Sequence, residues 1–195
     1  KSFHLLRKHA DAQLLIEEIS KLMSGIEEGA KRTAEIVKGL RSFSRTDESE
    51  MKLAQVNDLI DSTFIILHNK MKDRVEVVKN YGNLPQVECY PGQLNQVFLN
   101  VLNNAIQAIQ GVGKIFITTC YQDNHVIISI RDTGTGIAEE ARQHIFDPFF
   151  TTKPVGEGTG LGLSISYGII EKHHGKITVK SEAGNGTEFI ISLPA

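Results

Sequence analysis

Three carboxamide side chains share one face of a predicted helix. Asn100, Asn104 and Gln107 stand at i, i+4 and i+7 in an apolar-faced segment over 91–110, a spacing that aligns them on one side of an α-helix. Their oxygens suit Mg²⁺, which keeps several waters and takes its other ligands from a few protein oxygens and phosphates, while their N–H groups can donate to phosphate. A solvated helix face would carry the same residues, and for this helix taken alone that simpler interpretation is slightly favoured.

Asp132 begins a second polar motif, Asp-Thr-Gly-Thr-Gly-Ile over 132–137. A carboxylate at a strand end can accept a proton from the exocyclic amine of adenine, where guanine would present an oxygen. The two glycines let the backbone close on a flat ring. A common Asp-x-Gly turn is the alternative for this hexapeptide.

Glycines are concentrated again at 156–162, Gly-Glu-Gly-Thr-Gly-Leu-Gly, immediately before a predicted helix. Exposed backbone N–H groups at a helix N-terminus attract phosphate. The segment lacks the Gly-Lys-Ser/Thr of a Walker A loop, and no strand directly precedes it as in a dinucleotide-binding fingerprint. A flexible surface linker is the alternative here, and an ordinary hairpin turn is the alternative for Gly-Asn-Gly-Thr at 184–187.

Hydrophobic periodicity predicts the elements that position these motifs. Helices are predicted at 57–71, 91–110 and 161–173, and strands at 52–56, 75–81, 87–90, 114–121, 125–131, 176–181 and 187–193. The runs on either side of 122–124 are expected to pair antiparallel, and the last two strands to form a hairpin. Helices segregated on one face of a mixed sheet make an α+β fold, a two-layer α/β sandwich.

A long coiled-coil-like helix is predicted to precede this sandwich, over 11–45. Its apolar positions alternate steps of four and three, the pattern of a helix buried against partner helices: Leu15, Ile19, Leu22, Ile26, Gly29, Thr33, Ile36, Leu40 and Phe43. Bundling with another chain is favoured over the alternative, an amphipathic helix folded onto its own domain. The polar segment 46–50 is predicted to be a linker, so the chain divides into a helical region, 1–46, and the sandwich domain, 47–195.

Composition excludes several classes of protein. The 195 residues carry a net charge of −2 without a Lys/Arg run, which argues against nucleic-acid binding. Cys89 and Cys120 have no metal-ligand or CxxC spacing. No apolar run approaches the ~20 residues that span a bilayer, and no signal peptide opens the chain. A cytoplasmic fragment without a membrane segment is therefore expected, from a parent protein that is itself free or membrane-attached.

In this order the motifs resemble the N, G1, F, G2 and G3 boxes of the sensor histidine kinase catalytic domain. That domain is a branch of the gyrase–chaperone–histidine kinase–MutL ATPases, with the Bergerat ATP-binding fold. The matching segments are Asn-Val-Leu-Asn-Asn-Ala at 100–105, Asp-Thr-Gly-Thr-Gly at 132–136, Phe-Asp-Pro-Phe-Phe-Thr-Thr-Lys at 146–153, Gly-Thr-Gly-Leu-Gly-Leu at 158–163 and Gly-Asn-Gly-Thr at 184–187. The resemblance covers nearly all of 47–195. The segment 29–45 is similar to the second helix of the family's dimerisation domain.

The resemblance implies a role for each motif. Asn104 ligates Mg²⁺ with Asn100 beside it, and Asp132 holds the adenine amino group. The segment 137–160 forms an ATP lid hinged on glycines, and Phe149 packs this lid onto the domain or the helical stalk. The remaining residues expected to bind ATP are Gln107, Gly134, Gly136, Ile137, Lys153, Gly158, Gly160, Leu161, Gly162, Leu163 and Thr187. Of these, Gly134 and Gly136 shape the adenine pocket, Gly160 and Gly162 present amides to the phosphates, and Thr187 backs the pocket.

The same resemblance predicts the reaction. ATPases of this superfamily place a Glu one turn before the metal-binding Asn as general base, whereas this chain has Asn100, which has no useful basicity. Slow hydrolysis is expected, with the nucleophile a histidine from another domain attacking the γ-phosphorus. The chain is thus expected to be part of an ATP-dependent protein-histidine kinase.

The phosphoacceptor is not evident in this sequence. His4 and His9 do not match the family's acceptor setting, and His173 and His174 read as helix C-terminal caps. The acceptor helix is expected to precede Lys1 in the parent protein. The expected partners are that helix, a second copy joined through the N-terminal helix, and a response regulator receiver domain. Two alternatives are a signalling adaptor with vestigial nucleotide binding and a water-using ATPase of the same superfamily.

Overall fold

A computed structural model describes residues 18–20, 22–27, 29–30, 33, 50–154 and 158–195. Of the predicted N-terminal seam, Ile19, Leu22, Ile26, Gly29 and Thr33 lie in helical residues, and Leu15, Ile36, Leu40 and Phe43 fall outside the described residues. The prediction that this helix bundles with another chain therefore stays a prediction.

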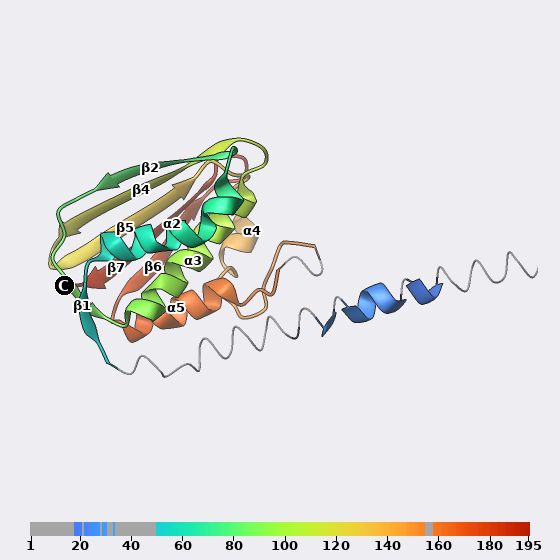
Figure 1. Cartoon of the computed structure of the whole chain (residues 1–195), viewed down its shortest axis with the longest axis horizontal. Helices are drawn as coiled ribbons and strands as arrows, with labels where there is room; N and C mark the ends of the chain where they lie inside the picture. Colours follow the sequence, from blue (N-terminus) through green and yellow to red (C-terminus); the bar gives the residue numbers. More distant parts are fainter. Residues whose placement is uncertain (1–17, 21, 28, 31–32, 34–49, 155–157) are drawn as a thin grey trace, which may run out of the picture.

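A five-stranded mixed sheet forms one layer of the domain (Figure 1). Its spatial order is β2 (Val75–Tyr81), β4 (Gly113–Gln122), β5 (His125–Asp132), β7 (Thr187–Pro194) and β6 (Lys176–Ser181). β2 pairs parallel with β4, and the other neighbours pair antiparallel. Both predicted hairpins are confirmed. The parallel pairing of β2 makes the sheet mixed, as expected.

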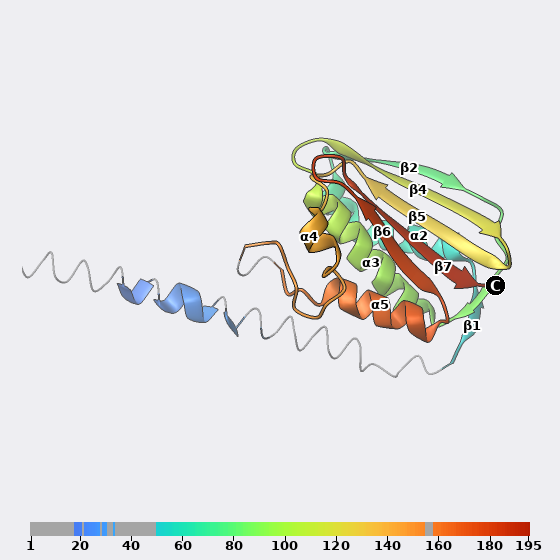
Figure 2. The same cartoon turned by 180° about the vertical axis from the view of Figure 1, so that it is seen from behind.

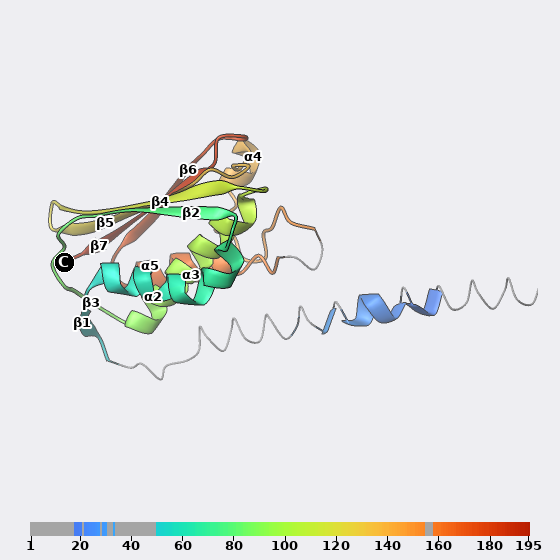
Figure 3. The ribbon, with the colours of Figure 1, turned by 45° about the horizontal axis from the view of Figure 1, so that its top comes forward.

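Three helices form the second layer: α2 (Val56–Met71), α3 (Pro91–Ala108) and α5 (Gly162–Lys172). They lie together on one face of the sheet (Figure 3), and Figure 2 shows the strands from the other side. The α+β two-layer sandwich predicted from the sequence is confirmed. Two short elements complete it: a ribbon of β1 (Lys52–Ala54) with β3 (Val87–Cys89), and the helix α4 (Glu139–Arg142), which the sequence analysis did not anticipate inside the predicted lid, 137–160.

Strand alternation carries two polar residues to the inner face of the sheet. Along β5 the buried positions are Val126, Ile128, Ile130 and Asp132, and along β7 they are Thr187, Phe189, Ile191 and Leu193. Because side chains alternate with a period of two, Asp132 at the end of β5 and Thr187 at the start of β7 face the same side of the sheet as these apolar residues. Asp132 and Thr187 are thus the polar ends of two otherwise apolar rows.

Arg74 holds the C-terminal end of α3. Its Nη2 donates to the carbonyl oxygens of Ile106 and Ile109, both at 2.7 Å. The last carbonyls of a helix have no partner within the helix, so a cationic donor satisfies them and favours the negative end of the helix dipole. This contact fixes the helix end against which the loop after β5 packs, since the Thr135 N–H donates to the Ala108 carbonyl at 3.1 Å.

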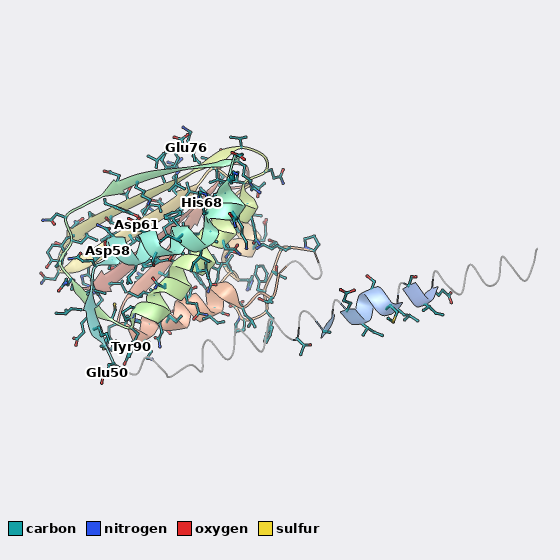
Figure 4. All side chains as sticks on the ribbon, viewed as in Figure 1. Glu50, Asp58, Asp61, His68, Glu76 and Tyr90 are labelled. Carbon is teal, nitrogen blue, oxygen red and sulfur yellow. The ribbon has the colours of Figure 1, made fainter. Side chains whose placement is uncertain are left out.

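His173 connects the other end of α3 to α5. Its Nε2 accepts a hydrogen bond from the backbone N–H of Tyr90 at 3.0 Å, and Nδ1 lies 2.7 Å from the Ile169 carbonyl oxygen, which requires the Nδ1–H tautomer. Tyr90 stands immediately before α3 (Figure 4). Burial lowers the pKa of His173 below its ordinary value. The prediction that His173 caps the C-terminus of α5 is confirmed, but the expected positive charge is not: the side chain is buried, accepts a hydrogen bond from Tyr90 and joins two helices.

The neutral state of His173 predicts a pH-dependent stability. The pKa of His173 is lower in the folded chain than the unfolded value of 6.5. The contribution of the neutral side chain to the free energy of unfolding is therefore fully present above pH 6.5 and is lost as the pH falls below that value. We expect denaturant unfolding to show a smaller free energy of unfolding at about pH 5.5 than at about pH 7.5, and His173→Gln to reduce this difference. His174→Gln, which changes the exposed neighbour, serves as the control. An unchanged pH dependence in His173→Gln would refute the assignment.

Candidate nucleotide and cation site

Asp132 is a buried carboxylate held by backbone amides. Its side chain is 3% exposed, and Oδ1 accepts hydrogen bonds from the N–H of Gly134 at 2.7 Å and of Thr187 at 3.3 Å. Desolvation raises the pKa of Asp132, and the two backbone hydrogen bonds oppose that shift. In the part of the chain that the structure describes, Oδ2 accepts no hydrogen bond. The carboxylate therefore keeps one oxygen for a donor that comes from outside the protein.

Glycines around Asp132 are required by close backbone approach. A Cβ at Gly134 would lie 2.7 Å from the Ala108 carbonyl oxygen. Gly136 and Gly186 both have positive φ, 68° and 77°, and a Cβ at either would overlap a backbone carbonyl, of Glu182 and of Asp132 respectively. These contacts bring the loop after β5 against the β6–β7 turn, so the backbone surrounds the carboxylate.

Ser181 is the residue that ties these loops together, and the sequence analysis missed it. Its hydroxyl accepts from the Ile137 N–H at 2.8 Å, donates to the Gly186 carbonyl at 2.8 Å and lies 2.9 Å from Thr187 Oγ1. Because a serine hydroxyl has one proton, and the carbonyl takes it, the Thr187 hydroxyl is the donor in the third contact. Thr187 and the start of the predicted lid are thus positioned by one side chain at the end of β6.

The carboxamides of α3 already contact a cation. Lys153 Nζ donates to Asn104 Oδ1 at 3.2 Å and also to Gln107 Oε1. The predicted row lies on one helix, α3, and two of its three members are contacted by a lysine of the predicted lid, some fifty residues later in the chain. Carboxamide oxygens that accept hydrogen bonds from an ammonium group are also suitable ligands for a hard cation such as Mg²⁺.

Asn100 points its amide nitrogen at the start of α5. Nδ2 donates to the Gly162 carbonyl at 2.9 Å and to Ser166 Oγ at 3.2 Å. A Cβ at Gly162 would meet the Asn100 carboxamide at 3.5 Å, which is ordinary van der Waals contact. Asn100 therefore links the helix that carries Asn104 to the glycine segment expected to bind phosphate.

The predicted lid closes on itself at Phe149 and Gly160. The Phe149 N–H donates to the Gly160 carbonyl at 2.9 Å, and both residues have φ of 67°. The Phe149 side chain is 58% exposed, so it does not pack onto the domain here, whereas Phe146 and Phe150 are partly buried against the core. Within 137–160 the structure leaves 155–157 undescribed.

The other predicted residues are placed around this segment. Gly158 lies against Thr151 and Lys153, where a Cβ would be 2.7 Å from Thr151 Oγ1. Leu161 is buried, while Leu163 and Ile137 pack against the core. Their side chains are therefore occupied in packing, and the backbone N–H of Ile137 is already donated to Ser181. A separate cavity of about 530 Å³ shares Ser181, Gly186 and Thr187 with the Asp132 site but contains neither Asp132 nor the α3 carboxamides.

Comparison with known proteins assigns the family. The model of the histidine kinase-, DNA gyrase B- and HSP90-like ATPases matches residues 89–195. Sporulation kinase E of Bacillus subtilis is 49% identical in a 138-residue alignment that covers 64% of this chain and 18% of that protein. The signal transduction histidine-protein kinase AtoS of Escherichia coli is 40% identical over 162 residues, 82% of this chain and 26% of that protein. The solved catalytic domain of histidine kinase ThkA, in a nucleotide-free form, superposes with a TM-score of 0.67 at 36% identity, covering 74% of this chain and 95% of that one.

The chain belongs to the sensor histidine kinases. It carries their ATPase-type catalytic domain and spans about a fifth to a quarter of the length of the curated kinases above. ThkA has also been solved in complex with the response regulator protein TrrA, and that kinase superposes with a TM-score of 0.68 at 31% identity over 85% of this chain and 48% of that one. In the described part of this kinase chain, no helix is long and apolar enough to cross a membrane.

Two glycines of the kinase motif at 158–163 are expected to respond differently to alanine. Gly160 has positive φ and a Cβ there would overlap the Phe149 backbone, whereas Gly162 has room. We expect Gly160→Ala to lower the free energy of unfolding by at least about 1–2 kcal/mol, and Gly162→Ala to change it by less than about 1 kcal/mol. Denaturant unfolding without nucleotide measures both. Equal losses would show that the Phe149–Gly160 closure is absent in solution.

Proposed function

We propose that residues 47–195 bind Mg-ATP and that the parent protein transfers the γ-phosphate to a histidine, for relay to an aspartate of a response regulator. One observation carries the nucleotide assignment: Asp132 is buried with Oδ1 held by two backbone N–H groups and Oδ2 left for an outside donor. A buried carboxylate without a cation beside it is costly unless a ligand completes its hydrogen bonds. The adenine amino group is that donor, and ATP is available in the cytoplasm, where we place the domain.

The cation assignment is supported by the chemistry of the α3 face. Asn104, with Asn100 beside it, would hold Mg²⁺, and Gln107 and Lys153 would lie next to the phosphates. The described residues contain no group of three or more His, Cys, Asp or Glu side chains suited to a metal, so phosphate oxygens would supply the remaining ligands. When bound, Mg²⁺ neutralises charge on the transferring phosphoryl group. This chain's own residues orient the triphosphate: Gly160 and Gly162 through backbone amides, and Lys153 through its ammonium group.

Transfer to a histidine is favoured over hydrolysis by the state of Asn100. Its amide nitrogen is engaged with Gly162 and Ser166, and a carboxamide cannot take a proton from water. A water-using ATPase of the same superfamily is therefore the less favoured alternative. A signalling adaptor with vestigial nucleotide binding is disfavoured because the glycines that allow close backbone approach around Asp132 are all present.

The N-terminal region 1–46 is proposed as part of the dimerisation and phosphotransfer region. Its described seam residues are exposed in the single chain: Ile19 at 54%, Leu22 at 66% and Ile26 at 68%. An apolar helical stripe of this kind needs a partner, and we propose a second copy together with the acceptor helix of the parent protein. A receiver domain is proposed as the further partner because the related kinase ThkA was solved with its regulator.

Calorimetric titration with a non-hydrolysable ATP analogue and Mg²⁺ tests the nucleotide site. We expect saturable binding that Asp132→Asn weakens by about 10- to 150-fold, since a charged hydrogen-bond acceptor is worth ~1.5–3 kcal/mol. The same variant should unfold at a higher temperature, because Asn keeps an oxygen that can accept from Gly134 and Thr187. It also removes a buried carboxylate, whose desolvation raises its pKa. Asp123→Asn, at an exposed turn residue with positive φ, is the control. Absence of binding by the wild-type chain would overturn the proposal.

Incubation of this chain alone with γ-labelled ATP tests the source of the nucleophile. We expect no acid-labile label on the chain and negligible phosphate release, because the chain lacks a histidine in the acceptor setting and a general base beside Asn104. An acid-labile label on the chain would instead identify an acceptor among its own seven histidines. Rapid phosphate release without label would favour the water-using ATPase.

A further inference from the structure

The two ends of the Asn100 carboxamide have different chemistry, and which end faces the nucleotide decides what Asn100 can do. An outward oxygen makes it a cation ligand, whereas an outward amide makes it a phosphate donor. Its inward end lies 2.9 Å from the Gly162 carbonyl oxygen and 3.2 Å from Ser166 Oγ. The nature of these two partners therefore sets the orientation.

Both partners offer only lone pairs to Asn100. The Gly162 carbonyl has no proton, and the single proton of the Ser166 hydroxyl is donated to that same carbonyl at 2.8 Å. With its proton used, Ser166 Oγ can only accept, so the group that faces it must be the amide nitrogen. A reversed carboxamide would place its oxygen against two acceptors.

Burial makes this arrangement strict. Ser166 is 0% exposed, so no bulk water replaces the contact. Asn100 Oδ1 accepts no hydrogen bond from the described residues. Ser164, two residues earlier on α5, also donates to a backbone carbonyl, that of Leu161 at 3.0 Å. Of these two serines of α5, Ser166 is the one that accepts a hydrogen bond from the Asn100 carboxamide among the described residues.

We propose that Ser166 is a positioning residue that turns Asn100 so that Oδ1, and not the amide, faces the cation of bound Mg-ATP. This rests on the proposed function, in which that face of α3 receives the nucleotide. Ser166 acts through Asn100 and does not itself contact the ligand. It also ties the metal-binding face of α3 to Gly162, so the cation site and the phosphate-binding segment are held in one register.

The ratio of nucleotide affinity with Mg²⁺ to affinity in EDTA tests the proposal. For Ser166→Ala we expect this ratio, measured with a non-hydrolysable ATP analogue, to fall by about 2- to 12-fold, the effect of one neutral hydrogen bond. The affinity in EDTA should change by less than about twofold, since the base and phosphate contacts remain. Ser164→Ala, which removes a hydroxyl from the same helix, should leave the ratio unchanged.

A size-matched pair keeps the test sharp if the alanine variant is unstable. Ser166→Thr keeps the hydroxyl and should retain the wild-type ratio, whereas Ser166→Val should lose it, with thermal unfolding recorded for both. Equal losses of nucleotide affinity with Mg²⁺ and in EDTA in the Ser166 variants would overturn the positioning role. A fall of the ratio in Ser164→Ala as large as in Ser166→Ala would overturn it too. If the wild-type chain binds no nucleotide, the proposed function falls and this role with it. Wild-type binding with an unchanged ratio in Ser166→Ala overturns the positioning role alone.

Discussion

The site depends on keeping a carboxylate inside the sandwich without a cation beside it. Asp132 occupies the last inner-face position of β5, where the alternation that buries Val126, Ile128 and Ile130 would otherwise call for an apolar side chain. Two backbone N–H groups offset part of the desolvation cost. Those amides can reach it only because the surrounding backbone is glycine-rich. The glycines are thus a consequence of the buried charge as much as a means of admitting a ligand.

The helix α3 is the second rigid part, because it is held at both ends by side chains remote from the motifs. His173 binds the backbone before its first turn, and Arg74 binds the carbonyls at its last. Its middle is joined to α5 through Asn100 and to the predicted lid through Lys153. A functional constellation built on a helix anchored in this way keeps its geometry when the neighbouring loop moves.

The sequence predicted more of the fold than of the contacts. Hydrophobic periodicity predicted β2 and β6 with the bounds that the structure has, and the polar turn at 122–124 indicated the β4–β5 hairpin. The parallel pairing of β2 with β4 and the order of strands depend on contacts remote in sequence, which periodicity does not encode. The short helix α4 has 4 residues, too few for a helical hydrophobic period to be recognised.

For the site, residue types and the family resemblance indicated Asp132 and the asparagines, whereas the hydrogen bonds of Ser181, Ser166 and Arg74 follow from tertiary structure that no local pattern marks. His173 shows the limit most clearly: its place at a helix C-terminus suggested a cation, and only its burial and its Tyr90 partner show it to be neutral.

The closure between Phe149 and Gly160 has a consequence for how this domain can vary. One backbone hydrogen bond brings Phe149 and Gly160 together, so the distance between these two residues is fixed by that contact and not by the length of the chain that joins them. Lengthening the loop between them changes the free energy of loop closure little, since each doubling of a flexible loop costs only about 0.6 kcal/mol. This loop can therefore accept insertions away from Phe150 and Lys153, which contact the core and α3, while Asp132 and the helices stay in place.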